Sequence, residues 1–358
     1  MSPLFPFRIP SLRAYGALRS CGLLSICALL ASGCVRTRTE LIAPLDAPAV
    51  ARADSAKSAV TEPASSRREA EGPSALRMQN VDFHISPRVV LHVRQLRGEA
   101  VPTQPDQPVT FDDRRSFLIG IAAADVGVTL VDLGHLLNEY VLAYPAAPLF
   151  DLRLSRNGER LRLEGKLHKK GDVPFEILAS VSTTTSGEIR VHPSSIKVAH
   201  VPAGGLLKLV GLRLDKLINL GGSRGGRVVG NDILLDVERM IPPPVIRGHL
   251  ASVHLAEDGI RLTFLSPGSA SSVTEPALPE AATNYLHFRG GTIRIGKLFM
   301  VHSDLEIIDE APGDALDFDI DQYARQLDAG YVKSTPAHGL IVHMPDLHTL
   351  TDLGSVSR

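Results

Sequence analysis

The clearest secondary-structure signal lies in T-L-V-D-L-G-H-L-L-N-E-Y-V-L-A-Y, residues 129–144. Its apolar side chains follow the helical spacing i, i+3, i+4, i+7 and i+8, and they are Leu133, Leu136, Leu137, Tyr140 and Val141. Thr129 and Asp132 have the spacing of a capping box, which marks a helix N-terminus. The stretch therefore predicts an amphipathic helix that buries its leucine-rich face.

Strand patterns surround this helix on both sides. Apolar residues alternate with polar ones in 81–85, 117–121, 161–167 and 260–264, which predicts strands with one buried face. Asn157-Gly158 and Asp258-Gly259 separate such runs and predict hairpins, the first through a type I′ turn. We expect an α+β fold with a long antiparallel sheet and two or three helices.

A second amphipathic helix is predicted over residues 204–220. Its apolar stripe would consist of Leu207, Val210, Leu214 and Leu217. Three cations, Lys208, Arg213 and Lys216, would lie at the margins of the stripe, where they could meet anionic headgroups. A shorter third helix fits residues 320–329, with a buried face of Ile320, Tyr323, Ala324 and Leu327.

The glycine-rich stretch G-G-S-R-G-G-R-V-V-G-N-D, residues 221–232, allows two interpretations. It follows a predicted helix, whereas nucleotide-binding loops precede one, so a flexible connection is favoured. In the functional alternative, Arg224 and Arg227 contact the headgroup of a lipid.

The N-terminus has the layout of a bacterial lipoprotein signal. Arg8, Arg13 and Arg19 precede an uncharged apolar run over residues 21–33, which is too short to span a membrane. The sequence Leu-Ala-Ser-Gly-Cys that ends at Cys34 resembles a lipobox, which implies cleavage before Cys34 and lipidation of its thiol. Val35 is not Asp, so resemblance to Gram-negative sorting signals implies a periplasmic protein anchored to the outer membrane.

Composition narrows the possible partners. Cleavage would remove two of the three cysteines and lipidation would use the third, so disulfides and thiolate metal sites are not expected. The leader contains three of the 38 basic residues and none of the 39 acidic ones, which leaves a mature net charge of −4. This charge argues against a general nucleic-acid-binding protein.

Changes in composition suggest six segments along the chain. We expect a signal peptide at 1–33, a disordered tether at 34–77 and an α+β domain at 78–265. A linker or long loop at 266–283 would lead to a C-terminal strand and helix extension at 284–350, followed by a disordered tail at 351–358.

Catalytic motifs do not emerge from the sequence. The thirteen histidines show no H-E-x-x-H spacing, and neither G-x-S-x-G nor a P-loop occurs. Ser194 and Lys197 have S-x-x-K spacing, but they fall in a predicted strand, where they would point to opposite faces. The acids at 317–321 do not match a calcium loop and are expected to begin the helix at 320–329. We expect a protein that is not an enzyme and has no cofactor and no metal site.

The helix at 129–144, the following P-L-F-D-L-R-L-S-R-N-G-E-R-L-R-L-E-G-K-L and the later I-P-P-P turn resemble the LmeA-like phospholipid-binding proteins of bacterial envelopes. These belong to the tubular lipid-binding superfamily. Leu137-Asn138, Gly158 and L-x-L-x-G at 161–165 carry the resemblance, which covers 108–264. It implies a long curved sheet wrapped around one or two amphipathic helices, with an aliphatic groove for acyl chains.

Three functions remain open. The first is a membrane-anchored envelope lipoprotein that binds phospholipid or another acyl-chain lipid, in lipid transport or envelope maintenance, with the nine apolar positions of both helices lining the groove. The second is a structural or assembly lipoprotein, in which the same side chains fill a solid core and an unidentified protein is the partner. The third is a hydrolase with an unfamiliar site.

Overall fold

The computed structural model describes residues 72–168, 171–200, 205–208, 214–266 and 282–350. The chain divides into two compact units, Met1–Ala59 and Val60–Arg358, and every described residue belongs to the second. The lipobox with Cys34, the tail at 351–358, and Val210 and Arg213 lie outside the described residues. The same applies to the side chains of Leu207, Lys208 and Leu217.

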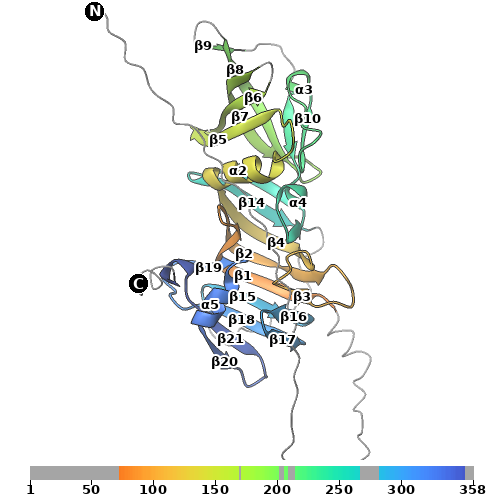
Figure 1. The fold of residues 1–358 in the computed structure, drawn as a ribbon, viewed down its shortest axis with the longest axis vertical. Helices are drawn as coiled ribbons and strands as arrows, with labels where there is room; N and C mark the ends of the chain where they lie inside the picture. The colour runs from red at the N-terminus through yellow and green to blue at the C-terminus, as the bar shows by residue number, and fades with distance from the viewer. Residues whose placement is uncertain (1–71, 169–170, 201–204, 209–213, 267–281, 351–358) are drawn as a thin grey trace, which may run out of the picture. The chain divides into compact units, whose positions relative to one another are not determined.

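An eleven-stranded sheet is built around the longest strands of the chain (Figure 1). In spatial order, nine of its strands are β13 (Leu250–Leu255), β14 (Gly259–Leu265), β4 (Phe117–Thr129), β2 (Val89–Pro102), β1 (Ser74–Ser86), β15 (Tyr285–Arg289), β18 (Asp304–Asp309), β21 (Leu340–Met344) and β20 (Tyr331–Ser334). The other two are β12 (Val245–Arg247), beside β4, and β19 (Leu316–Asp319), beside β1.

Two further sheets complete the described β-structure. The seven-stranded sheet has the order β10 (Gly226–Val229), β11 (Asp232–Leu235), β8 (Ile189–His200), β7 (Asp172–Thr183), β6 (Arg160–His168) and β5 (Leu149–Asn157), with β9 (Gly205–Lys208) beside β8. The three-stranded sheet has the order β17 (Leu298–Val301), β16 (Thr292–Ile295) and β3 (Val109–Thr110). The expectation of long antiparallel sheets with few helices is confirmed, although β12, β19, β21 and β3 each form a parallel pair.

The predicted helix at 129–144 is confirmed. It consists of α2 (Leu130–Leu136) and a π-helical continuation, η1 (Leu137–Val141). Thr129 is the N-cap, because its hydroxyl accepts a hydrogen bond from the backbone N–H of Asp132 at 3.0 Å. The backbone N–H of Leu142 donates to the carbonyl of Leu137 at 2.8 Å, which gives the wider turn of a π-helix.

The predicted second helix over 204–220 is wrong. Residues Gly205–Lys208 form β9 and pair with Lys197–His200 of β8. Among the residues of this range that the structure describes, only α3 (Leu214–Leu217) is helical. Glycines at 204, 205 and 211 weaken a helix by about 1 kcal/mol each. Residues Gly205–Lys208 therefore pair with the available edge of β8 instead of forming a helix.

The third predicted helix begins later than expected. Ile320 precedes the observed helix α5 (Tyr323–Ala329), and Ala324 is exposed rather than buried. Asp317 and Asp319 belong to β19, and Asp319 accepts hydrogen bonds from the backbone N–H groups of Asp321 and Gln322 just before this helix, at 2.8 and 3.1 Å. The remaining short helix is α4 (Val237–Met240).

Local pairing also corrects two turn predictions. Asn157 pairs with Arg160, so the connecting residues are Gly158 and Glu159, and only Gly158 has positive φ, at 62°. This matches the glycine-first II′ arrangement rather than type I′. The stretch 221–232 is not a flexible connection, because β10 and β11 form an antiparallel hairpin within it.

Most of the C-terminal strands are part of the first sheet, namely β15, β18, β19, β20 and β21, whereas β16 and β17 pair beside β3. β15 pairs with β1 over Ala75–Gln79, and β19 pairs in parallel with Val81–His84 of the same strand. The ordered domain also begins earlier than position 78, since β1 starts at Ser74. No helix in the described part of the chain is both long and apolar enough to cross a membrane.

A cross-strand pair on this sheet makes its stability depend on pH. His92 of β2 lies opposite Asp82 of β1, with Nδ1 2.7 Å from the carboxylate oxygen. The hydrogen bond to Asp82 raises the pKa of His92 above 6.5, against the opposing effect of burial. The stabilisation is therefore complete below pH 6.5 and is lost as the pH rises through the folded-state pKa.

We expect His92→Gln to lower the unfolding free energy more at pH 5.5 than at pH 9. The pair is partly exposed, so the difference should stay below about 1 kcal/mol. Urea unfolding at both pH values measures it, with His254→Gln on the exposed face of β13 as the control. Equal losses at both pH values would contradict the assignment.

Candidate functional site

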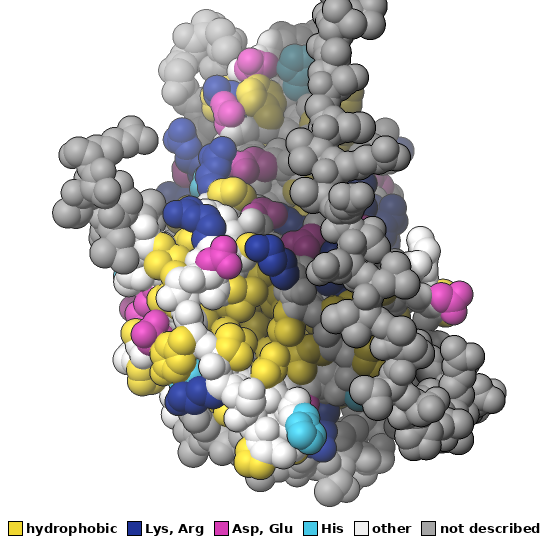
Figure 2. All heavy atoms as spheres, turned by 60° about the horizontal axis from the view of Figure 1, so that its bottom comes forward, with side chains coloured by type: hydrophobic (Ala, Val, Ile, Leu, Met, Phe, Trp, Pro, Cys, Tyr) yellow, Lys and Arg dark blue, Asp and Glu magenta, His cyan; other side chains and the backbone are white. Residues whose placement is uncertain are grey.

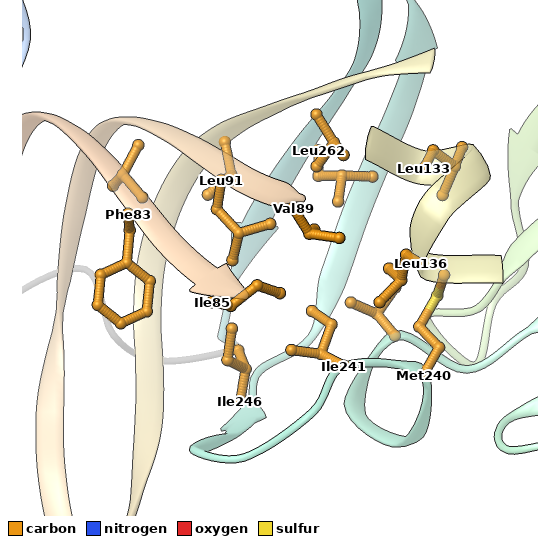
Figure 3. Close-up of a cluster of buried hydrophobic side chains, with 14 of the residues drawn as sticks. Phe83, Ile85, Val89, Leu91, Leu133, Leu136, Met240, Ile241, Ile246 and Leu262 are labelled. Atoms are coloured by element: carbon orange, nitrogen blue, oxygen red, sulfur yellow. The ribbon is translucent and has the colours of Figure 1, made fainter. Parts of the chain in front are cut away.

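The inner face of α2 and η1 packs into the protein core. Leu133, Leu136, Leu137 and Val141 are all at most 7% exposed, and Tyr140 packs against them half-buried. Figure 3 shows Leu133 and Leu136 among side chains from both the strands and α4, including Leu262, Ile241 and Met240. The predicted leucine face is thus confirmed as a buried face.

Two small cavities lie beneath this helix, and apolar residues alone line them. One has a volume of about 40 Å³ and lies between α2, α4 and the first sheet. The other, of about 60 Å³, lies between α2, η1 and the second sheet. Leu133, Ile189 and Ile260 line both cavities. Ligand pockets usually measure about 300 to 1,000 Å³, so these leucines act as core in this structure.

A much larger groove opens on the other side of the same helix, and its volume is about 830 Å³. The outer face of α2–η1 forms one wall and β5 the other. The lining residues are Arg88, Leu130, Val131, Gly134, His135, Asn138, Glu139, Leu142, Leu149, Phe150, Asp151, Leu152, Arg153 and Leu154. We call this the α2–β5 groove.

Asn138 fixes the two walls of the α2–β5 groove to each other. Its amide nitrogen donates to the carbonyls of Gly134 and Leu152, at 2.9 and 2.8 Å, and its amide oxygen accepts from the backbone N–H of Leu152 at 2.9 Å. Leu152 lies where the pairing of β5 with β6 is interrupted, and the neighbouring Asp151 has positive φ, at 53°. Asn138 thus replaces the missing strand partner at this bulge.

Charges of both signs line the rim of the groove. Arg88 pairs with Glu139 at 3.0 Å, and His135 is 3.2 Å from the same carboxylate. Asp151 pairs with Lys166 at 2.7 Å. Arg153 is exposed, and no described acidic side chain forms an ion pair with it.

Of the headgroup residues expected from sequence, the three whose side chains are described, Lys216, Arg224 and Arg227, do not line this groove. Lys216 is exposed on α3. The guanidinium of Arg224 stacks on the ring of Tyr140, 4.6 Å from its centroid. Arg227 makes two hydrogen bonds to the carboxylate of Glu188, at 2.8 and 2.6 Å, so its charge is already compensated. Of the other predicted groove residues, Leu214 is fully buried in the core.

Sequence reasoning missed Arg88, Arg153 and the outer face of α2. The strict alternation of Leu152 and Leu154 assigns Arg153 to a plain solvent face, and nothing in the pattern reveals the bulge beside it. The one available signal was Asn138, an amide side chain in the interior of the predicted helix at 129–144.

Comparisons with protein-family models, with curated proteins and with solved structures found no match to this chain.

Proposed function

We propose that this protein binds an acyl-chain lipid in the α2–β5 groove. The observation that carries the proposal is the size of the groove, about 830 Å³, together with the leucines among its lining residues. Leu142, Leu149 and Leu152 are three of these leucines and are each at most 7% exposed. An acyl chain requires such a surface, because its affinity comes from buried apolar area at about 25 cal/mol per Å².

The exposed part of the groove, where Val131 and Arg153 lie, suits an amphiphile better than a plain hydrocarbon. Val131 is 67% exposed at one wall, so apolar surface remains in contact with water. Arg153 lines the same groove, and its guanidinium could form two hydrogen bonds with a phosphate. The ligand class that satisfies both features is a phospholipid, with its tail along the leucines and its phosphate at Arg153.

The cellular part of the proposal comes from the sequence. Lipidation at Cys34 would hold the protein at the periplasmic side of the outer membrane, within reach of its ligand. The position of α2–η1, with side chains in contact with both large sheets, supports the resemblance to LmeA-like tubular lipid-binding proteins. In this proposal the lipid binds at the outer face of α2–η1. Core side chains fill the space between the inner face of this helix and the sheets.

Replacing Val131 by Asp should reduce bound phospholipid about tenfold or more. A carboxylate beside an acyl chain is costly to desolvate, whereas Asp in the first turn of a helix does not harm folding. The chain from Val35 onward is incubated with phosphatidylglycerol–phosphatidylethanolamine vesicles, re-isolated and analysed by native mass spectrometry with organic extraction.

Val229→Asp is the matched control, because Val229 is 52% exposed on β10 and does not line the groove. It should retain wild-type lipid, and Arg153→Gln should lose phospholipid more than it loses free fatty acid. Wild-type protein that stays free of lipid, or equal losses in both valine variants, would rule out this groove as the binding site.

A second candidate function, protein binding, is favoured by exposed apolar side chains elsewhere. Phe299 and Val301 on β17 are 57% and 49% exposed, and Tyr331 and Val332 on β20 are 47% and 56% exposed. Both strands lie at the end of the domain that faces the reader in Figure 2, where hydrophobic side chains gather inside a border of charged ones. Apolar surface of this kind is typical of protein interfaces. A protein without bound lipid that captures an envelope protein through these strands would favour this function.

A further inference from the structure

Three aspartates from separate parts of the C-terminal segment come together at one end of the first sheet. Asp309 ends β18, Asp314 lies in the following loop, and Asp346 follows β21. One carboxylate oxygen from each lies within 4.8 Å of the other two. The parallel pairing of β18 and β21 causes this approach, because it places Asp309 opposite Met344, two residues before Asp346.

Asp346 is the unusual member of this cluster. Its side chain is only 6% exposed, and its Oδ1 has no hydrogen-bond partner among the described residues. An unpaired buried carboxylate is expensive, and such groups in proteins are normally paired or bound to a metal. The carboxylate of Asp346, to which this unpaired oxygen belongs, lies close to the carboxylates of Asp309 and Asp314.

The surrounding residues hold the other two aspartates in place. Asp309 accepts hydrogen bonds from the backbone N–H of Ala311 at 2.8 Å and from the Asn284 amide at 3.2 Å. Asn284 also donates to the backbone carbonyl of Asp314, and so does Asn80, at 3.3 Å. The loop is thereby fixed by Asn80 of β1 and by Asn284, which precedes β15, while the exposed side chain of Asp314 leaves a path from solvent.

We propose that Asp309, Asp314 and Asp346 form a binding site for Ca²⁺. The donor set contains only oxygen, which suits hard cations and disfavours zinc. Calcium binds oxygen at about 2.3–2.6 Å, so its ligands can be up to about 5 Å apart, and the separations of at most 4.8 Å fall within that span. Magnesium requires a tighter octahedron, with oxygens at about 2.0–2.1 Å.

The spacing of the three carboxylates also implies mutual repulsion, because one oxygen of each lies within 4.8 Å of the other two. Like charges that repel one another in this way favour a divalent cation among them.

The test measures thermal unfolding and Ca²⁺ titration calorimetry on the metal-stripped full chain in a nonionic detergent at pH 7.5. The wild type should bind one Ca²⁺, with a dissociation constant on the order of 10⁻⁶ to 10⁻³ M, and its melting temperature should rise with Ca²⁺. Mg²⁺ at the same concentration should produce a smaller rise.

Asp346→Asn separates a metal site from a structural cluster. It removes one ligand and one repulsive charge, so it should weaken Ca²⁺ binding at least tenfold while raising the melting temperature of the metal-free protein. Asp328→Asn, on the exposed face of α5, is the control that should leave both quantities unchanged. Absence of Ca²⁺ binding to the wild type up to 10 mM, or equal binding by Asp346→Asn, would overturn the proposal. So would a wild-type protein that is stabilised by acid but not by Ca²⁺, which would show that the carboxylates share a proton instead.

Discussion

Replacing Phe318 by Ala should destabilise the domain by about 3–5 kcal/mol. Phe318 is fully buried in β19, where its ring stacks on Phe83 of β1 and on Tyr323 of α5, with centroid distances of 5.8 and 6.2 Å. Phe111 meets it edge-on at 6.1 Å. Removing the ring would leave a cavity between segments from both ends of the described chain.

The matched control is Phe299→Ala, because Phe299 is 57% exposed on β17 and should cost no more than about 0.5 kcal/mol. Urea unfolding followed by circular dichroism compares the two variants. Limited proteolysis shows in addition whether the segment from Tyr285 onward detaches first in Phe318→Ala. Similar losses of stability would mean that the C-terminal segment contributes little to the core, contrary to its pairing with β1.

Replacing Gly98 by Ala should cost about 3 kcal/mol or more, although it adds only one methyl group. Gly98 lies in β2 next to an irregularity in its pairing with β4. A Cβ atom there would lie 2.0 Å from the carbonyl oxygen of Gly120, and its next neighbours are also backbone atoms. Backbone in the middle of a sheet cannot rotate away as a side chain can, so β2 and β4 would have to separate.

Gly127→Ala in β4 is the control for Gly98→Ala. The nearest atom to its added Cβ would be the Cβ of His92, at 3.6 Å, which is ordinary van der Waals contact. This variant should change stability by less than about 1 kcal/mol, and it could gain stability from the restricted unfolded chain. The difference in urea midpoint between the variants measures the clash, and equal midpoints would contradict the close approach of β2 and β4.

Local sequence patterns determined the helix at 129–144 and most of the strands. Leucine spacing at 3.6 residues identified which face of α2–η1 is buried, and Thr129 marked its start. These features depend on residues that are close in sequence, so the sequence of this one protein is enough to predict them. The helix expected over 204–220 failed because β8 offered an edge to which Gly205–Lys208 could pair. The outcome depended on the position of β8, which the local sequence pattern of residues 204–220 does not reveal.

Tertiary structure alone decided both proposed binding sites. The α2–β5 groove depends on a bulge at Asp151 and on Asn138, which bridges 14 residues to Leu152. The aspartate cluster depends on the parallel pairing of β18 with β21, which brings Asp346 to Asp309. In both cases the decisive contact joins polar groups that are distant in sequence and have no periodic pattern. The sequence by itself therefore determined which residues are buried, and the packing of those buried faces determined where the remaining polar groups meet.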